Sequence, residues 1–268
     1  MPFALIGFTL GMTQPGNQFD ILLLAKVILC MVFARTAAMA FNRYADRFVD
    51  EKNMRTNGRE IPSGKVSAHS ALLLVFISSG LFILTAYWIN KLCLFLSPLA
   101  LAVVLGYSYT KRFTWLCHLI LGIGLSLAPI GAYLAVTGTF HLVPLCFSFA
   151  VIFWVSGFDI IYALQDEEFD RISKLHSMPA AFGKKKALTI SKLLHVISIS
   201  SLVLAGLLLP FHWIFWLGLT TFAFMLIYQH SLVKQDDLSR INIAFFTMNG
   251  VASLLFAFFS IVDLSVYY

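Results

Sequence analysis

Eight long apolar segments run through this chain and restrict its fold more than any other feature. Each has about 20 residues, the length that an α-helix needs to cross roughly 30 Å of hydrocarbon. We therefore predict eight transmembrane helices, which lie at about residues 21–41, 68–89, 92–110, 115–136, 142–164, 188–209, 212–230 and 243–262.

A shorter apolar segment covers residues 1–12. It meets a turn signal that contains Pro15 and Gly16. Neither a preceding basic residue nor a small-x-small cleavage pattern supports a signal peptide, so we interpret the segment as part of a ninth, shortened helix. The composition agrees with a membrane protein, because 59% of residues are hydrophobic and only 12% are charged. The prediction is an all-α, polytopic membrane bundle of nine helices, forming one domain over residues 1–268.

Positive charge falls in alternate connections between the apolar segments. Residues 42–67 hold six Lys or Arg and residues 165–187 hold five, whereas the opposite side holds only Lys91. Because cytoplasmic connections carry the excess of positive charge, we expect both regions to face the cytoplasm from the inner membrane. The net charge of +6 is then explained by topology and anionic headgroups, without nucleic acid or an obligate protein partner.

The first acidic cluster follows the 21–41 segment. Asn42, Asp46 and Asp50 are spaced at i, i+4 and i+8, so a continuing helix places all three on one face. An alternative is that these acids make surface salt bridges with Arg43 and Arg47, which have matching spacing. Either arrangement predicts a helix that extends past the membrane surface.

The second acidic cluster ends the 142–164 segment. Asp159, Tyr162, Asp166 and Asp170 fall at intervals of 3, 4 and 4 residues, close to a single helical stripe. Asp159 lies below the membrane surface, where an ionised carboxylate needs a cation or a strong hydrogen-bond donor. Arg35 lies inside another apolar segment and needs an anionic partner, so an Arg35 or lysine pair with Asp159 is the structural alternative.

Two acidic clusters on one membrane face suggest a divalent metal site for a phosphorylated substrate. Mg²⁺ prefers hard oxygen ligands and is often held by one or two carboxylates plus substrate phosphates. The histidines lack the spacing of a zinc site, and we interpret His118 as a packing residue, with substrate contact as the alternative.

The same residues resemble the motifs of the UbiA superfamily of intramembrane aromatic prenyltransferases. Residues 42–50 are similar to its NxxxDxxxD motif, and residues 59–64 to the trailing R-x-I/L-P-S-G. Residues 162–170 are similar to its YxxxDxxxD motif, with Phe182-Gly183 downstream. Residues 107–114 resemble its short basic connection, so the resemblance spans nearly the whole chain.

The resemblance implies a helical bundle around a central cavity open to lipid, capped by two cytoplasmic loops that carry the motifs. It also implies magnesium-dependent transfer of a prenyl group from a polyprenyl diphosphate to an aromatic acceptor. By position, the metal ligands are Asp46, Asp50, Asp166 and Asp170, supported by Asn42 and Asp159.

The residue inventory agrees with that chemistry. Breaking the allylic carbon–oxygen bond leaves negative charge on diphosphate and an allylic cation that aromatic rings can shield from water. An arginine can bind the carboxylate of an aromatic acid and orient its ring. We expect Lys111, Arg112, Arg55 and Lys174 at the diphosphate, Tyr107 and Tyr162 at the allylic cation, and Arg35 or Arg43 at the acceptor carboxylate.

The acceptor is less constrained than the reaction. Residues 128–133 and 175–179 resemble a 4-hydroxybenzoate transferase branch, so we predict 4-hydroxybenzoate and a role in ubiquinone-type quinone biosynthesis. A dihydroxynaphthoate of menaquinone biosynthesis is the alternative. A membrane transporter is the alternative of a different class, but it predicts broken helices at the midplane rather than acids at helix ends.

Overall fold

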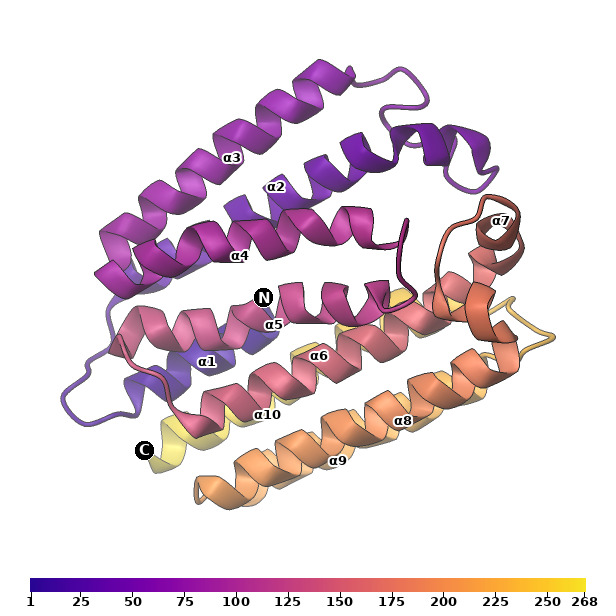
Figure 1. The fold of residues 1–268 in the computed structure, drawn as a ribbon. Coiled ribbons are helices and arrows are strands. Elements are labelled where there is room, and N and C mark those ends of the chain that lie inside the picture. The colour runs from indigo at the N-terminus through magenta and orange to yellow at the C-terminus, as the bar shows by residue number, and fades with distance from the viewer.

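The computed structural model describes all 268 residues and is built almost entirely from helices. Nine helices form the bundle, and the short helix α7 lies in a connection, which confirms the predicted architecture (Figure 1). The elements are α1 (Pro2–Met12), α2 (Ile21–Lys52), α3 (Ala68–Ile89), α4 (Lys91–Thr110), α5 (Cys117–Thr137), α6 (Leu142–Ala163), η1 (Leu164–Asp166), α7 (Glu167–Ile172), α8 (Met178–Leu208), α9 (Trp213–Leu232), η2 (Ile243–Met248) and α10 (Asn249–Tyr267).

Seven of these helices are long and apolar enough to cross a membrane, so the chain is an integral membrane protein. They are α2, α3, α4, α5, α6 with its continuation through α7, α8, and α10 with η2. The eighth predicted span, α9, has 20 residues and packs beside α10. Helix α2 extends beyond its predicted span because its polar end remains helical at the bundle end. Helix α8 begins before its predicted span, but a kink at Gly183, where φ is 77°, interrupts this added part.

The helices form two groups. Helices α2, α3 and α4 pack against one another, while α1, α5, α6, α8, α9 and α10 share the largest apolar core (Figure 1). Aromatic side chains dominate that core and meet mostly in tilted or edge-to-face pairs, which stabilise packing beyond the area buried. Its largest fully buried rings are Phe147, Phe215, Phe222 and Phe256.

Small residues allow α1, α5 and α6 to approach closely. A Cβ atom at Gly7 would lie 2.0 Å from the carbonyl oxygen of Pro129 in α5. A Cβ atom at Gly122 of α5 would lie 2.4 Å from the carbonyl oxygen of Ile152 in α6. Close backbone contact through small residues is typical of helix packing in membranes, where apolar surface alone does not favour association.

Polar side chains define where several helices begin. Asp20 caps α2 and Ser67 caps α3 by accepting hydrogen bonds from backbone amides of the first turn. The buried Asp263 of α10 accepts from the amides of His212 (3.0 Å) and Phe215 (3.1 Å). Its carboxylate therefore satisfies the free N–H groups at the start of α9.

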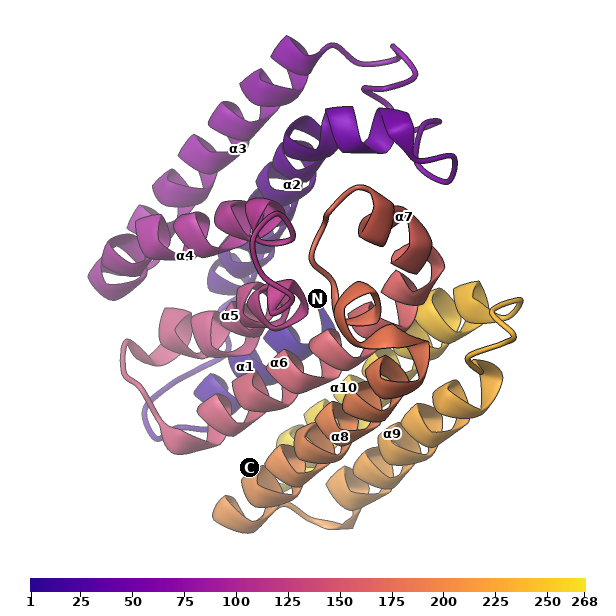
Figure 2. The same cartoon turned by 45° about the vertical axis from the view of Figure 1, so that its right-hand side comes forward.

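Both motif-bearing segments lie at one end of the bundle. The C-terminal ends of α2 and α4, the segment η1–α7 and the start of α8 gather there, as Figure 2 shows. The 53–67 connection faces the α7 segment across this end, and side-chain contacts join the two. This arrangement brings together residues that are more than 100 positions apart in the sequence.

Candidate active site

The first motif lies on the exposed end of α2. The amide of Asn42 donates a hydrogen bond of 2.9 Å to Asp46, one helical turn further on. The other carboxylate oxygen of Asp46 lies 3.5 Å from Nη2 of Arg112, in the α4–α5 connection. The predicted helical spacing therefore holds, and Asp46 is linked to a second element.

Asp50 is the buried member of the first motif, with only 4% of its surface exposed. Nη1 of Arg59 lies 2.7 and 2.9 Å from its two carboxylate oxygens. The salt bridges to Arg43 and Arg47 that the spacing suggested are absent. Arg43 instead pairs with Glu60 at 3.1 Å, and Arg47 donates to a backbone carbonyl.

The second motif does not continue as one helix. Helix α6 ends at Ala163, and the 3₁₀ turn η1 separates Tyr162 from α7, so the single stripe predicted for the second cluster is interrupted. A 3₁₀ turn has three residues per turn, which changes the directions of the side chains that follow. Asp166 ends η1 and Asp170 lies in α7.

Asp166 joins the two motif-bearing segments. Arg55 binds it through both Nε, at 2.9 Å, and Nη2, and the amide of Asn53 donates to it at 3.1 Å. The Arg55 Nη1 also donates to the hydroxyl of Tyr162 at 3.1 Å. Tyr162 stacks on Phe245 with ring centroids 4.0 Å apart, so an aromatic wall begins directly beside the paired charges.

Asp170 is fully buried, with 0% of its surface exposed. Nζ of Lys111 lies 2.7 Å from Oδ1, and the Ser177 hydroxyl donates to Oδ2 at 2.8 Å. Burial lowers the pKa of an ammonium group, but the carboxylates of Asp170 and Asp166 outweigh that effect, so the pKa of Lys111 lies above its usual value. Lys111 is therefore a cation at neutral pH.

Each of the four motif aspartates is paired with a different cation: Asp46 with Arg112, Asp50 with Arg59, Asp166 with Arg55 and Asp170 with Lys111. These pairs join α2, the 53–67 connection, the α4–α5 connection and the η1–α7 segment. Carboxylates and cationic groups therefore lie next to each other at one end of the bundle. The carboxylates could bind a metal cation there, and the arginine and lysine side chains could bind an anion.

Replacing Lys111 with methionine should lower the free energy of unfolding by about 2 kcal/mol, because the buried Asp170 loses its counter-charge. The double variant Lys111→Met/Asp170→Asn should recover most of that loss. Thermal unfolding in detergent, followed by tryptophan fluorescence, measures both. Lys174→Met is the matched control, because that lysine is exposed and unpaired, and its expected effect is below about 0.5 kcal/mol. Equal destabilisation by the two single variants would contradict the prediction.

The partner of Asp159 is a histidine, and neither Arg35 nor a lysine pairs with it. Nδ1 of His118 lies 2.6 Å from Oδ2 of Asp159, and Nε2 of His118 accepts the backbone N–H of Met178 at 3.2 Å. Because Nε2 is an acceptor, the ring hydrogen lies on Nδ1 and is donated to Asp159. His118 is buried, as a packing residue would be, but 26% of the Asp159 side chain remains exposed. Asp159 thus keeps one accessible carboxylate edge below the paired charges.

Two predicted substrate-binding residues lie outside this constellation. Arg35 is exposed and makes neither an ion pair nor a hydrogen bond, so the expected buried anionic partner is absent. Lys174 is also exposed and does not contact the motif acids, because it follows the end of α7 in a left-handed conformation with φ of 55°. Tyr107 lies half-buried on α4, within electrostatic range of Asp46 and Asp159.

The donor set fits a hard divalent cation, although no three His, Cys, Asp or Glu side chains converge on one point. The four aspartates supply carboxylate oxygens, which Mg²⁺ prefers. Oδ1 of Asp170 is buried and its partner is the Lys111 ammonium at 2.7 Å, so this oxygen would be free to bind a cation if Lys111 moved away. Collecting the carboxylates around an ion requires that their arginine and lysine partners move away from them.

The sequence model that describes the UbiA prenyltransferase family matches residues 1–251. The chain belongs to this family. It is 31% identical to a 4-hydroxybenzoate octaprenyltransferase of Nitrosomonas europaea over 238 residues, covering 89% of this chain and 81% of that protein. It is 32% identical to the enzyme of the same name from Nitrosospira multiformis over 240 residues, covering 90% and 82%.

Solved structures of UbiA homologues share the fold. The apo structure of a homologue from Aeropyrum pernix K1 is 30% identical, with a TM-score of 0.88 and coverage of 98% of this chain and 97% of that one. A homologue from Archaeoglobus fulgidus, solved bound to DMAPP and Mg²⁺, is 22% identical, with a TM-score of 0.70 and coverage of 99% and 96%. The bundle is therefore the UbiA fold.

Three residues of this UbiA-family site have no role in the sequence predictions. Arg59 holds Asp50, Asn53 donates to Asp166, and Ser177 donates to Asp170. Arg59 lies in the motif that carries the family resemblance and Asn53 lies beside it. Their position in or near this motif could have marked them as site residues. No spacing rule links Ser177 to Asp170, because their contact depends on how the chain turns between α7 and α8.

Proposed function

We propose that this UbiA-family protein transfers a polyprenyl group from a polyprenyl diphosphate to 4-hydroxybenzoate and releases diphosphate, in ubiquinone-type quinone biosynthesis. The carrying observation is the set of four aspartate–cation pairs beside an aromatic wall. The relatives named as 4-hydroxybenzoate octaprenyltransferases support the choice of substrates.

The paired charges suit the diphosphate end of the donor. Asp46, Asp50, Asp166 and Asp170 would hold Mg²⁺, and a homologue of the same fold has been solved with DMAPP and Mg²⁺. When bound, Mg²⁺ neutralises charge on the departing diphosphate. The cations that now neutralise the aspartates become available to bind diphosphate oxygens in their place, and these are Arg55, Arg59, Lys111 and Arg112.

The aromatic wall suits the allylic end. The carbon–oxygen bond breaks with its electron pair on diphosphate, and the allylic cation that remains must be kept from water. The rings of Tyr162 and Phe245 are stacked, and Phe158 meets Phe245 edge-on at 5.4 Å. This wall leads from the charged end into the bundle, where aromatic faces stabilise a carbocation.

Asp159 suits the acceptor hydroxyl. Its accessible edge can accept the hydroxyl proton of 4-hydroxybenzoate, which increases electron density at the neighbouring ring carbon that attacks the allylic cation. His118 positions this carboxylate through the 2.6 Å hydrogen bond. Arg43 or Arg35 would bind the acceptor carboxylate, since both lie on α2 with Asn42. The released diphosphate accepts the ring proton at the attacked carbon, which restores aromaticity, and Asp159 returns the hydroxyl proton to the phenolate oxygen.

The basic connections favour a cytoplasmic site. Residues 42–67 and 165–187 lie at the bundle end that carries the motifs, and their excess of Lys and Arg predicts a cytoplasmic orientation. A water-soluble aromatic acid would enter from that side, while the isoprenoid tail stays in lipid.

Membranes that contain the protein should convert labelled polyprenyl diphosphate and 4-hydroxybenzoate into a lipid-soluble product. Chelation of divalent cations should reduce the rate by more than about 100-fold, and added Mg²⁺ should restore it. Dihydroxynaphthoate as acceptor in a parallel reaction tests the menaquinone alternative. A faster reaction with dihydroxynaphthoate would replace the acceptor assignment, and no product with either acid would refute the transferase proposal.

A further inference from the structure

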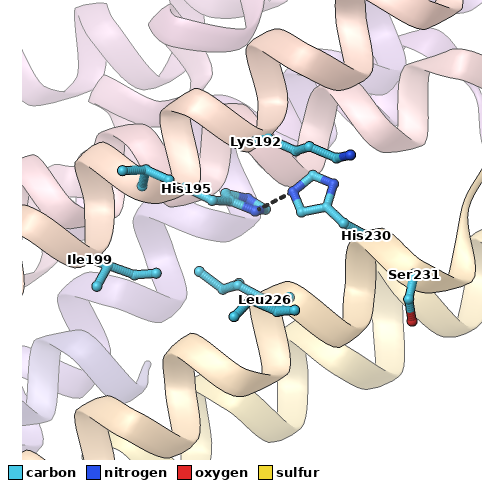
Figure 3. Close-up of a pocket in the computed structure, with 8 residues that line it drawn as sticks. Lys192, His195, Ile199, Leu226, His230 and Ser231 are labelled. Atoms are coloured by element: carbon cyan, nitrogen blue, oxygen red, sulfur yellow. Dashed lines mark hydrogen bonds between the residues drawn. The ribbon is translucent and has the colours of Figure 1, made fainter.

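A pocket of about 440 Å³ lies between α8 and α9, apart from the aspartate–cation pairs. Figure 3 shows that polar side chains occupy one end and apolar side chains the other. The two helices meet here near the bundle end that carries the acidic motifs, since α8 begins and α9 finishes there. The lining residues that matter are Lys192, His195, Ile199, Leu226, His230 and Ser231.

The pocket contains a histidine pair with one unused nitrogen. Nε2 of His195 faces the carbonyl oxygen of Trp154 at 3.3 Å, so the ring hydrogen lies on Nε2. Nδ1 of His195 then accepts the N–H of His230 Nε2, at 3.0 Å. This leaves Nδ1 of His230 buried, with a lone pair and without a hydrogen-bond partner. A buried acceptor of this kind costs free energy unless a donor reaches it.

Gly157 of α6 makes this arrangement possible. A Cβ atom at this position would lie 2.3 Å from Cδ2 of His195. Only glycine therefore lets the His195 ring sit deep enough between the helices to reach Trp154 and to orient His230.

Lys192 adds an uncompensated positive charge. It is exposed and takes part in none of the ion pairs, and neither Asp nor Glu lines the pocket. Figure 3 shows its ammonium group on the same side of the pocket as the His230 ring. An anion at this end meets a cation and, through its own hydroxyl groups, the free nitrogen of His230.

The other end of the pocket is apolar and faces outward. Val196 and Ile227 line it with 59% and 68% of their surfaces exposed, as is expected of residues that contact lipid tails. Ile199 follows Lys192 by seven residues, which is about 10 Å along the helix. The pocket thus changes from charged to apolar over the distance between a phospholipid headgroup and its acyl chains.

A second pocket beside the first is also lined by basic residues, and these lie in the α9–η2 connection. It has a volume of about 290 Å³, shares Ser231 with the first, and is lined by Lys234 and Arg240 together with Asp237. Basic residues near a membrane surface attract anionic lipids. The charge therefore favours an anionic lipid over a zwitterionic one.

We propose that the α8–α9 pocket binds an anionic glycerophospholipid with hydroxyl groups in its headgroup, of the phosphatidylglycerol type. Lys192 binds the phosphate, a headgroup hydroxyl donates to Nδ1 of His230, and an acyl chain covers Val196, Ile199 and Ile227. The lipid site is independent of the prenyl-transfer site.

Native mass spectrometry of the full-length protein, titrated with phosphatidylglycerol or phosphatidylcholine of equal chain length, tests the proposal. Wild-type protein should retain phosphatidylglycerol preferentially. Lys192→Gln should weaken that retention about five-fold, and His230→Phe should weaken it while leaving phosphatidylcholine unaffected. Lys186→Gln is the matched control, because it removes the same charge from an exposed position of α8 outside the pocket.

Equal retention of the two lipids by wild-type protein would overturn the proposal, as would unchanged phosphatidylglycerol retention in Lys192→Gln. A further titration with inorganic phosphate distinguishes the source of the anion. Displacement of the lipid by millimolar phosphate would identify a soluble phosphate site instead, and persistence of the lipid supports the proposal.

Discussion

Asp166→Asn is expected to lower kcat for prenyl transfer by about 1,000-fold, or roughly 4 kcal/mol of transition-state stabilisation. Asp166 accepts hydrogen bonds from Arg55 and Asn53 of the 53–67 connection. It therefore links the two motif-bearing segments that would form the diphosphate site. Asparagine keeps the size and one acceptor oxygen but removes the negative charge that would hold Mg²⁺. Initial rates at saturating substrates, in reconstituted vesicles, measure the effect.

Glu168→Gln is the control for this variant. Glu168 lies two residues away, is exposed and makes no ion pair, so loss of its charge should change kcat less than two-fold. Matching thermal unfolding of the two variants establishes that both fold. Full activity of Asp166→Asn at limiting Mg²⁺ would refute the metal-binding role.

Asp159→Asn is expected to lower kcat at pH 7 by about 100-fold, because the acceptor hydroxyl loses its proton acceptor. The amide oxygen of the substituted side chain can still accept the hydrogen bond of His118, so folding and donor binding should be preserved. The deficit should shrink as pH rises toward about 10, where a phenol ionises without assistance. Lys111 stays charged through most of this range because its pKa is raised, so the diphosphate site should be unaffected.

The pH profile of the wild-type protein is the control for Asp159→Asn. Its rate should be nearly flat from about pH 7 to 9, while the rate of the variant rises. Parallel profiles would show that Asp159 has no part in proton removal. An increase in the KM for the polyprenyl diphosphate alone would assign Asp159 to donor binding instead.

Much of the fold was predictable because a membrane imposes simple rules. The boundaries of α3 were predicted at residues 68–89 and are observed there, since an apolar run of fixed length is a direct signal. The membrane span that ends near residue 41 was expected to continue as a helix through Asp50, and α2 does continue to Lys52, because the i, i+4, i+8 spacing of the acidic cluster is itself a helical signal. The spacing predicted that Asn42 and Asp46 share one helix face, and the hydrogen bond between them agrees, because this relation depends only on helix geometry.

Long-range partners were not predictable in the same way. The spacing offered Arg43 and Arg47 as the alternative, local partners of the first acidic cluster, but Asp50 binds Arg59 from the following connection. Arg35 was expected to pair with an acid inside the membrane, whereas Asp159 is held by His118. Local spacing says which residues share a helix face, and it does not say which other element packs against that face.

The amino-acid sequence by itself determined that the chain spans a membrane, which connections carry the positive charge, and which acids form the two motifs. These properties follow from hydropathy, charge counts and spacing along one helix. Only the tertiary structure decided that each motif aspartate has its own cation, that His118 positions Asp159, and that His195 and His230 form a pair beside Lys192. Those contacts join residues from different helices, so they depend on packing and on close approach at positions such as Gly157.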